Sequence, residues 1–206
     1  MRTVLTACAV LWLTAAGVQA QSPQPAAPPF QIDKACPAGA AIQMDLAAGQ
    51  YFIHASPDAR LRVRWTTREP GDASKVYAKA EVAGTEGRVS ISGPSNGFSV
   101  TIEVPSRSNV TVSLTAGDFS IDAVDGDVDI SAWAGKMQVS VGNPSDYYSV
   151  YASVTAGQIR ADRFGGEKGG LLRSVSWEGK GKHALRVRLT AGEIILLPAS
   201  PKSPPA

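Results

Sequence analysis

Histidine and cysteine are the residues that this sequence has least of. Its 206 residues include two histidines and two cysteines. Neither His54 nor His183 lies at metal-ligand spacing from the other histidine or from Cys36. Zinc sites and nucleophilic catalysis need such side chains in clusters. We therefore interpret the protein as a non-enzyme, with no catalytic residues and no cofactor.

Long hydrophobic runs are missing after the N-terminus. The apolar run Val4–Leu13 follows Arg2 and precedes small residues that end at Ala20, which predicts a secretory signal peptide over residues 1–20. A transmembrane helix needs about 20 apolar residues, so we expect none. The expected location is the periplasm, the cell surface or the medium. Lipoprotein cleavage at Cys8 is the less favoured alternative, because the apolar run continues beyond it.

Cleavage after Ala20 leaves Cys36 as the single cysteine of the mature chain. One cysteine cannot form an internal disulfide, so stability has to come from burial of a core. The sequence allows two roles for Cys36. It is either a buried, unreactive thiol or the site of an intermolecular bridge in an oxidising compartment.

Net charge is also low, with 20 Lys and Arg against 18 Asp and Glu. This balance and the expected export argue against nucleic acid as a partner. Proline is concentrated at both ends of the mature chain, which predicts a Pro-rich linker over residues 21–30 and a disordered tail over 198–206. Residues 31–197 are long enough for one domain with a sizeable core.

The chain does contain a recurring unit of the pattern Gly-polar-apolar-polar-apolar. It begins at Gly87, Gly117, Gly126, Gly135 and Gly157, and a sixth copy with one polar place lost begins at Gly192. Three copies are introduced by the tripeptide Thr-Ala-Gly. Side chains alternate across a strand, so the two apolar residues of each unit are expected to face a core and the polar residues to face water.

Short strands separated by glycines nine residues apart favour a coil of stacked rungs. We predict an all-β, single-domain β-solenoid, similar to a parallel β-helix, with an antiparallel, hairpin-like N-terminal part. An antiparallel β-sandwich is the alternative. The glycine-rich segment 165–182 is expected to form an irregular hairpin that leaves the coil.

The segments that begin with Val104-Pro105, Val110-Thr-Val-Ser-Leu-Thr-Ala-Gly-Asp-Phe-Ser-Ile and Trp133-Ala-Gly-Lys-Met-Gln-Val resemble the bacterial "putative adhesin" family. The resemblance covers roughly residues 45–197. It implies an exported β-helix-like domain of unknown function. It also implies no known catalytic residues, so no functional positions carry over.

Two groups of residues are candidate binding sites. Asp125, Asp127 and Asp129 lie close together in the sequence, and calcium requires several carboxylate oxygens at one place. The alternative is that these carboxylates belong to a solvated strand face. The segment 158–188 is rich in bases, and aromatic residues precede it, which suggests a surface for an anionic glycan or a lipid headgroup. The surface candidates are Tyr147, Tyr148, Arg160, Arg163, Arg186 and Arg188.

Three roles remain open for the exported domain. The first is an adhesin-like envelope or surface binding module, with a surface glycan or an envelope protein as its partner. The second is a structural, self-assembling envelope protein that pairs through a solenoid end or an edge strand. The third and least favoured is a polysaccharide-active enzyme, because the acidic residues do not form a recognised catalytic motif.

Overall fold

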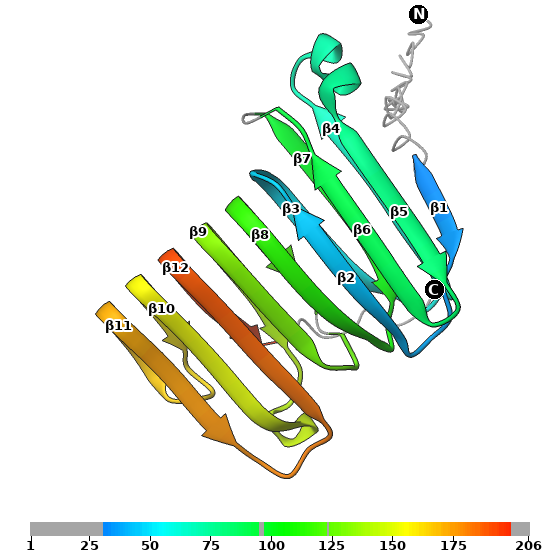
Figure 1. The fold of residues 1–206 in the computed structure, drawn as a ribbon. Coiled ribbons are helices and arrows are strands. Elements are labelled where there is room, and N and C mark those ends of the chain that lie inside the picture. Colours follow the sequence, from blue (N-terminus) through cyan, green and yellow to red (C-terminus); the bar gives the residue numbers. More distant parts are fainter. Residues whose placement is uncertain (1–30, 95–96, 123, 199–206) are drawn as a thin grey trace, which may run out of the picture.

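The structure is a computed structural model that describes residues 31–94, 97–122 and 124–198. The described residues form twelve β-strands and two 3-10 helices, and none of them is in an α-helix. All twelve strands belong to one mixed sheet (Figure 1). This confirms the all-β fold class. No helix in the described residues is long and apolar enough to cross a membrane. The predicted signal peptide and linker, and residues 199–206 of the predicted tail, lie outside the described residues.

The elements follow one another along the chain with few long connections. They are β1 (Ile32–Ala35), β2 (Ala40–Leu46), β3 (Gly49–Ser56), β4 (Arg60–Thr67), η1 (Pro70–Lys75), β5 (Tyr77–Ala83), β6 (Glu86–Ser92), β7 (Phe98–Pro105), β8 (Ser108–Ile121), β9 (Val128–Val141), η2 (Pro144–Asp146), β10 (Tyr147–Ala161), β11 (Gly166–Glu178) and β12 (His183–Pro198).

Parallel pairs form the middle of the sheet, and antiparallel pairs form its two ends. Strand β8 pairs in parallel with β9, β9 with β12, and β12 with β10. Strand β2 lies between β6 and β8, and β3 lies between β7 and β8, also in parallel. At the N-terminal end β1, β4 and β5 pair antiparallel with their neighbours, and at the other end β11 pairs antiparallel with β10. The last strand of the chain, β12, is thus inserted between β9 and β10 (Figure 1).

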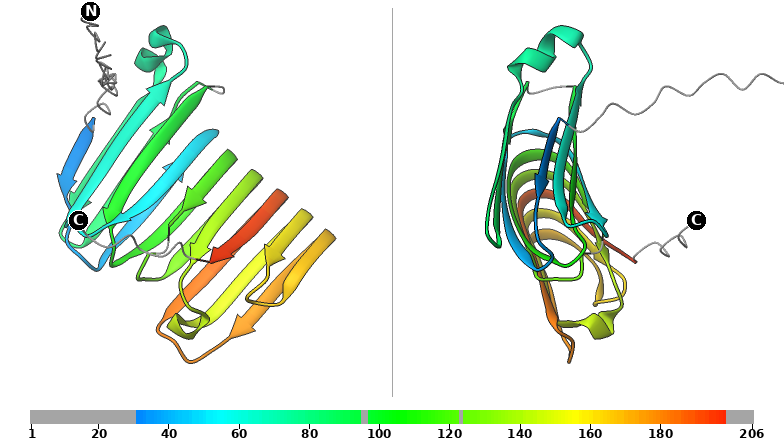
Figure 2. Two further views of the ribbon diagram at one scale, coloured as in Figure 1. Left: turned by 180° about the vertical axis from the view of Figure 1, so that it is seen from behind. Right: turned by 90° about the vertical axis from the view of Figure 1, so that its right-hand side faces the viewer.

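The long strands bend at glycines that lie in register with one another. Gly117 pairs with Gly135, Gly135 with Gly192, and Gly192 with Gly157. At Gly135 φ is +134°, and a Cβ atom there would lie 1.9 Å from the carbonyl oxygen of Gly117. Only glycine fits this conformation and this close approach. The bends fold the sheet into two layers, which Figure 2 shows end-on as a set of nested curves.

The nine-residue glycine spacing serves two different corners. Gly126 does not stack with Gly117 and Gly135; it lies in the loop between β8 and β9, where an added Cβ would lie 2.0 Å from the Ser108 carbonyl oxygen. Alternate glycines of the series therefore stand at opposite ends of the strand segments. Two of the nine-residue units therefore lie between glycines that stack on one another, such as Gly117 and Gly135.

The core lies between the two layers and consists of alternate strand residues. Phe119, Ile121, Ile130, Met137 and Val139 are all buried, as the alternation predicts. Burying each large side chain of this kind contributes about 1.5–3 kcal/mol. Cys36 is also buried, and burial raises the pKa of its thiol. This location agrees with the unreactive thiol and disfavours an intermolecular bridge.

The glycine-rich segment 165–182 is more regular than predicted. It does follow β10 as a hairpin, but β11 is a strand of thirteen residues that forms the edge of the sheet and is interrupted by a positive φ of 51° at Leu172. Lys168 and Arg173 of β11 lie opposite the buried Ile159 and Val154. Charged residues on the core-facing side of an edge strand discourage the addition of further strands.

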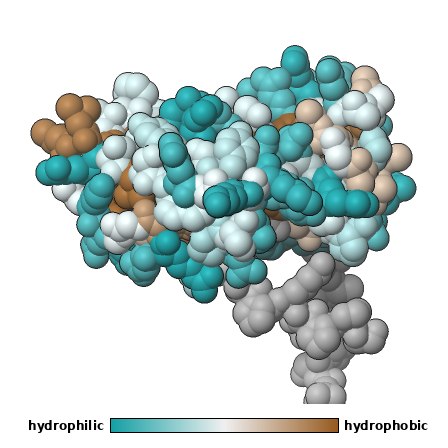
Figure 3. Space-filling model, turned by 90° about the horizontal axis from the view of Figure 1, so that it is seen from below, coloured by the Kyte–Doolittle hydropathy of each residue, from teal (hydrophilic) through white to brown (hydrophobic). Residues whose placement is uncertain are grey.

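Hydrophobic side chains are nevertheless exposed at this end of the molecule. Leu171 and Leu172 on β11 are 72% and 81% exposed. Figure 3 shows a hydrophobic group at the end that β11 occupies, whereas most of the surface in that view is hydrophilic.

Candidate functional site

One outer face of the sheet carries a shallow groove across β5, β6, β2, β8 and β9. The buried residues Ile91, Leu46 and Leu114 are register partners, and Leu114 pairs with Ala132. Because side chains alternate, the residues that follow them point outward and lie side by side. These residues are Ser92, Ala47, Thr115 and Trp133, and Tyr77 on β5 pairs with Ser92 at the end of the row.

Two exposed aromatic side chains stand at the ends of this row. Tyr77 is 59% exposed and Trp133 is 68% exposed. Short side chains lie between them, so the surface is hollowed into an open groove of about 630 Å³. Tyr77 and Trp133 are four strands apart in the sheet, which corresponds to about 19 Å between their backbones. We call this feature the Tyr77–Trp133 groove.

The Tyr77–Trp133 groove is rich in hydroxyl groups and poor in charge. Its hydroxyl-bearing floor residues are Ser90, Ser92, Ser113, Thr115, Ser131 and Thr190. Among the described residues that line it, Asp45 is the one charged side chain. Asp45 pairs in register with Ser90 on one side and with Ser113 on the other. The groove thus presents a carboxylate between two hydroxyls and has no lysine or arginine in its described lining.

The three predicted calcium ligands do not come together. Asp125 lies 2.8 Å from Nε2 of His183, and Oδ1 of Asp127 accepts a hydrogen bond of 2.8 Å from the backbone N–H of Ala184. Asp129 lies on β9 and contacts arginines of the neighbouring strand β12. Each carboxylate therefore has its own partner, and within the described part of the chain no three acidic, histidine or cysteine side chains are placed to hold a metal ion.

The predicted basic and aromatic surface is divided between the two layers. Arg186 and Arg188 point outward on the same face as the groove, where Arg188 lies 2.9 Å from Asp129 and donates to the Ser131 hydroxyl at 3.2 Å. Arg160 follows the bend at Gly157 and lies on the other layer, paired with Glu193. The exposed Arg163 lies in the turn after β10. These arginines do not form one continuous surface.

One of these surface candidates, Tyr147, is wrong, because the structure buries it. Its ring is 5% exposed and packs edge-on against Phe164, with 6.4 Å between the ring centroids. The hydroxyl accepts a hydrogen bond of 3.3 Å from the Gly142 N–H, and burial raises the pKa of Tyr147. Tyr147 is the first residue of β10, so it starts the inward-facing set, and its neighbour Tyr148 points outward at 49% exposure.

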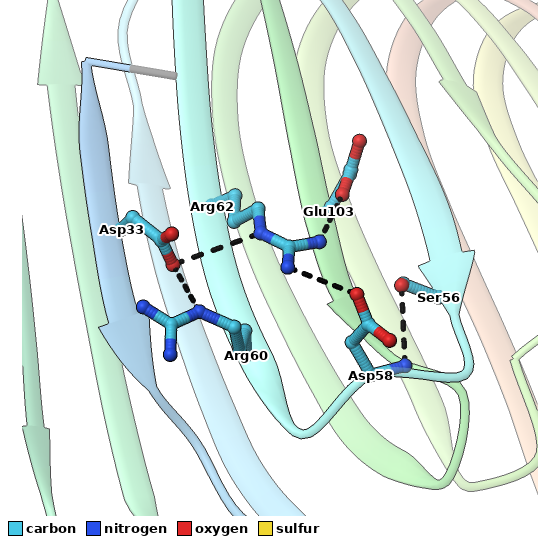
Figure 4. Close-up of polar contacts among 6 residues, drawn as sticks. All are labelled: Asp33, Ser56, Asp58, Arg60, Arg62 and Glu103. Carbon is cyan, nitrogen blue, oxygen red and sulfur yellow. Dashed lines mark hydrogen bonds and ion pairs between the residues drawn. The ribbon is translucent and has the colours of Figure 1, made fainter. Parts of the chain in front are cut away.

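A charged cluster on the other layer joins three strands (Figure 4). Arg62 on β4 lies 3.0 Å from Glu103 on β7, 2.9 Å from Asp58 and 3.7 Å from Asp33 on β1. Arg60 donates to Asp33 at 2.7 Å, and this hydrogen bond, with the charges of both arginines, lowers the pKa of that carboxyl. Two guanidinium groups meet three carboxylates here, so the cluster is net negative, and its ion pairs hold the N-terminal strand β1 to the sheet.

Sequence reasoning missed the groove, although one signal for it is present. Three bends are preceded by Thr-Ala-Gly, at Thr115, Thr155 and Thr190, whereas β9 has Trp133-Ala134-Gly135. Tryptophan therefore replaces threonine at an outward position of an otherwise uniform row. Tyr77 carries no comparable signal, because its place opposite Ser92 depends on the antiparallel pairing of β5 with β6.

Comparison with known proteins gives a structural likeness only. No protein-family model matches the chain, and no curated protein matches it. Among solved structures, the chain is similar to "a putative cell adhesion protein" from Clostridium sporogenes, with a TM-score of 0.51 and 17% sequence identity. The likeness covers 80% of this chain and 97% of that one. At this identity the comparison supports the adhesin-like fold and no finer conclusion.

Proposed function

We propose that the protein is an exported, non-enzymatic, adhesin-like binding module that attaches to a surface ligand through the Tyr77–Trp133 groove. The observation that carries the proposal is the pair of exposed aromatic rings at the ends of a groove on a rigid sheet. Water-exposed aromatic side chains that flank a hollow are typical of ligand-binding surfaces. The structural likeness to the Clostridium protein supports an adhesin-like role.

The bent sheet is best interpreted as a β-solenoid. In support, β8, β9, β12 and β10 keep one register on both sides of each bend, so every strand contacts its neighbours in both layers. In a sandwich of two sheets, the strands of the two layers would be separate. The N-terminal residues support export to the periplasm, the cell surface or the medium.

A structural, self-assembling role is the second candidate, because Leu171 and Leu172 are exposed on the edge strand β11. Against it, Lys168 and Arg173 occupy core-facing positions of that strand, where an added strand would have to bury them. A polysaccharide-active enzyme has less support. The carboxylates Asp125, Asp129 and Glu103 are each paired with a basic side chain.

The proposal is tested by sedimentation of the purified mature chain with envelope material from the cells that produce it. The wild-type chain should sediment with this material, and the double variant Tyr77→Ala, Trp133→Ala should remain in solution. Both side chains are exposed, so the variant should keep the circular dichroism spectrum of the wild type. Tyr148→Ala removes an exposed tyrosine outside the groove and serves as the matched control. Equal sedimentation of the double variant and the wild type would contradict the proposal.

A further inference from the structure

The chemistry of the groove lining indicates the class of its ligand. We infer that the Tyr77–Trp133 groove binds an uncharged glycan chain that lies across the strands. This inference rests on the proposed function and makes its ligand more specific. Six serine and threonine side chains, one carboxylate and two aromatic rings line the groove. A sugar chain has the complementary groups, because its ring faces carry C–H groups and its edges carry hydroxyls.

The row of residues that contains Tyr77 and Trp133 determines the direction in which the glycan chain lies. Between the two rings lie Ser92, Ala47 and Thr115, which are all short, so the hollow runs across the strands from one ring to the other. The distance of about 19 Å between the ring-bearing backbones accommodates several linked sugar rings. Each end of the oligosaccharide can then stack on one aromatic face while its middle lies over Ala47.

A second row of groove residues supplies polar contacts to the middle of the glycan chain. It consists of Ser90, Asp45 and Ser113. Asp45 stands between Ser90 and Ser113 at the strand spacing of about 4.8 Å. An ionised carboxylate accepts hydrogen bonds, whereas each serine hydroxyl donates one and accepts others. This combination fits neighbouring sugar hydroxyls, which donate and accept in the same way.

Charge and backbone pairing favour a neutral glycan over other ligands. A polyanion would meet Asp45 and no lysine or arginine among the described lining residues. The nearest cations are already paired, Lys79 with Glu81 at 2.7 Å and Arg188 with Asp129 at 2.9 Å. An extended peptide gains its affinity by pairing with an open sheet edge. The strands beneath the groove from β6 to β9 already pair with neighbouring strands on both sides, and the open edge of β5 is the one that faces away from the groove.

The test is binding of defined oligosaccharides, measured by isothermal titration calorimetry. The neutral probes are the hexasaccharides cellohexaose, chitohexaose, maltohexaose and mannohexaose, and the anionic probe is hexagalacturonate. We expect at least one neutral hexasaccharide to bind and hexagalacturonate not to bind. The matching trisaccharide should bind about tenfold more weakly, because it cannot reach both rings. Trp133→Ala should cost about tenfold in affinity, the loss of one aromatic stacking contact. Trp133→Phe should keep most of the affinity, and Tyr148→Ala should keep all of it.

Failure of this inference can be told apart from failure of the proposed function. Binding of hexagalacturonate alone, binding of no neutral probe, or binding that Trp133→Ala leaves unchanged would overturn the glycan inference. The sedimentation assay is repeated with envelope material treated either with periodate, which cleaves sugar diols, or with protease. If groove-dependent sedimentation survives periodate and is lost after protease treatment, the ligand is a protein and the binding function stands. If untreated material does not bind, the proposed function itself fails.

Discussion

The stacked glycines at the bends give the sharpest stability prediction. Replacing Gly135 by alanine would place a Cβ atom 1.9 Å from the carbonyl oxygen of Gly117, on a residue whose φ is +134°. An ordinary contact needs about 3.4 Å, so the neighbouring strands would have to separate by about 1.5 Å, a third of the normal strand spacing. The change therefore disturbs both the backbone conformation and the ladder between β8 and β9.

The expected loss is large on the scale of a domain's stability. Forcing an unfavourable φ on alanine costs about 1–3 kcal/mol. Each ladder hydrogen bond that the separation breaks costs about 1 kcal/mol, and two or three lie beside the bend. Together these effects predict a loss of about 3–6 kcal/mol, against a typical total of about 5–15 kcal/mol. Gly135→Ala should therefore lose a large part of its free energy of unfolding and unfold at a much lower urea concentration than the wild type.

Gly84 is the matched control for this substitution. It lies in the turn between β5 and β6, its φ is also positive at +59°, and an added Cβ would meet nothing within 4 Å. Gly84→Ala should cost only the conformational penalty of about 1–2 kcal/mol. Urea denaturation monitored by tryptophan fluorescence measures both variants, provided that the slope with denaturant is unchanged. Equal losses for the two variants would refute the stacking argument.

Two further predictions concern pH and buried polar groups. Burial raises the pKa of Tyr51 to about 12, so this residue should cost the wild type about 2 kcal/mol of stability as the pH rises from about 10 to 12, and Tyr51→Phe should remove this part of the loss. At pH 7 Tyr51→Phe should be more stable than the wild type by about 1 kcal/mol, because the buried hydroxyl has no hydrogen-bond partner among the described residues. Urea denaturation of both proteins at pH 7, 10 and 12 measures both effects. The hydrogen bond from Arg60 lowers the pKa of Asp33, so this carboxylate contributes stability above its ordinary pKa of 3.8 and loses it as the pH falls. The melting temperature of Asp33→Asn should accordingly fall less than that of the wild type between pH 5 and 2.5, and parallel acid curves would contradict this.

The alternation of residues along each strand was predictable from the sequence because it is local. Phe119 and Ile121 face the core since a strand places every second side chain on one face, whatever lies beside it. The glycines were also recognisable as corners. Gly126 differs from Gly117 and Gly135 in the backbone group that it approaches on the neighbouring strand. Gly126 lies against the carbonyl of Ser108, whereas Gly117 and Gly135 lie against glycine carbonyls. That difference depends on how neighbouring strands align with one another, which the local sequence pattern does not specify.

The Tyr77–Trp133 groove was harder to predict because strands that are distant in the sequence build it. Tyr77 and Trp133 meet at one groove only through the order β5, β6, β2, β8, β9, and this order places β2 between strands that follow it in the chain. Tyr147 was misjudged for a related reason. An aromatic residue beside basic residues in the sequence suggested a surface, but its position at the start of β10 turns it toward Phe164.

The central claim, that the groove is the binding surface, is tested most directly by hydroxyl-radical footprinting of the chain with and without envelope material from its producing cells. Bound material should protect Tyr77 and Trp133 from oxidation and leave Tyr148, Leu171 and Leu172 unprotected. Protection of Leu171 and Leu172, with Tyr77 and Trp133 oxidised as in the free protein, would contradict it and point to the β11 edge.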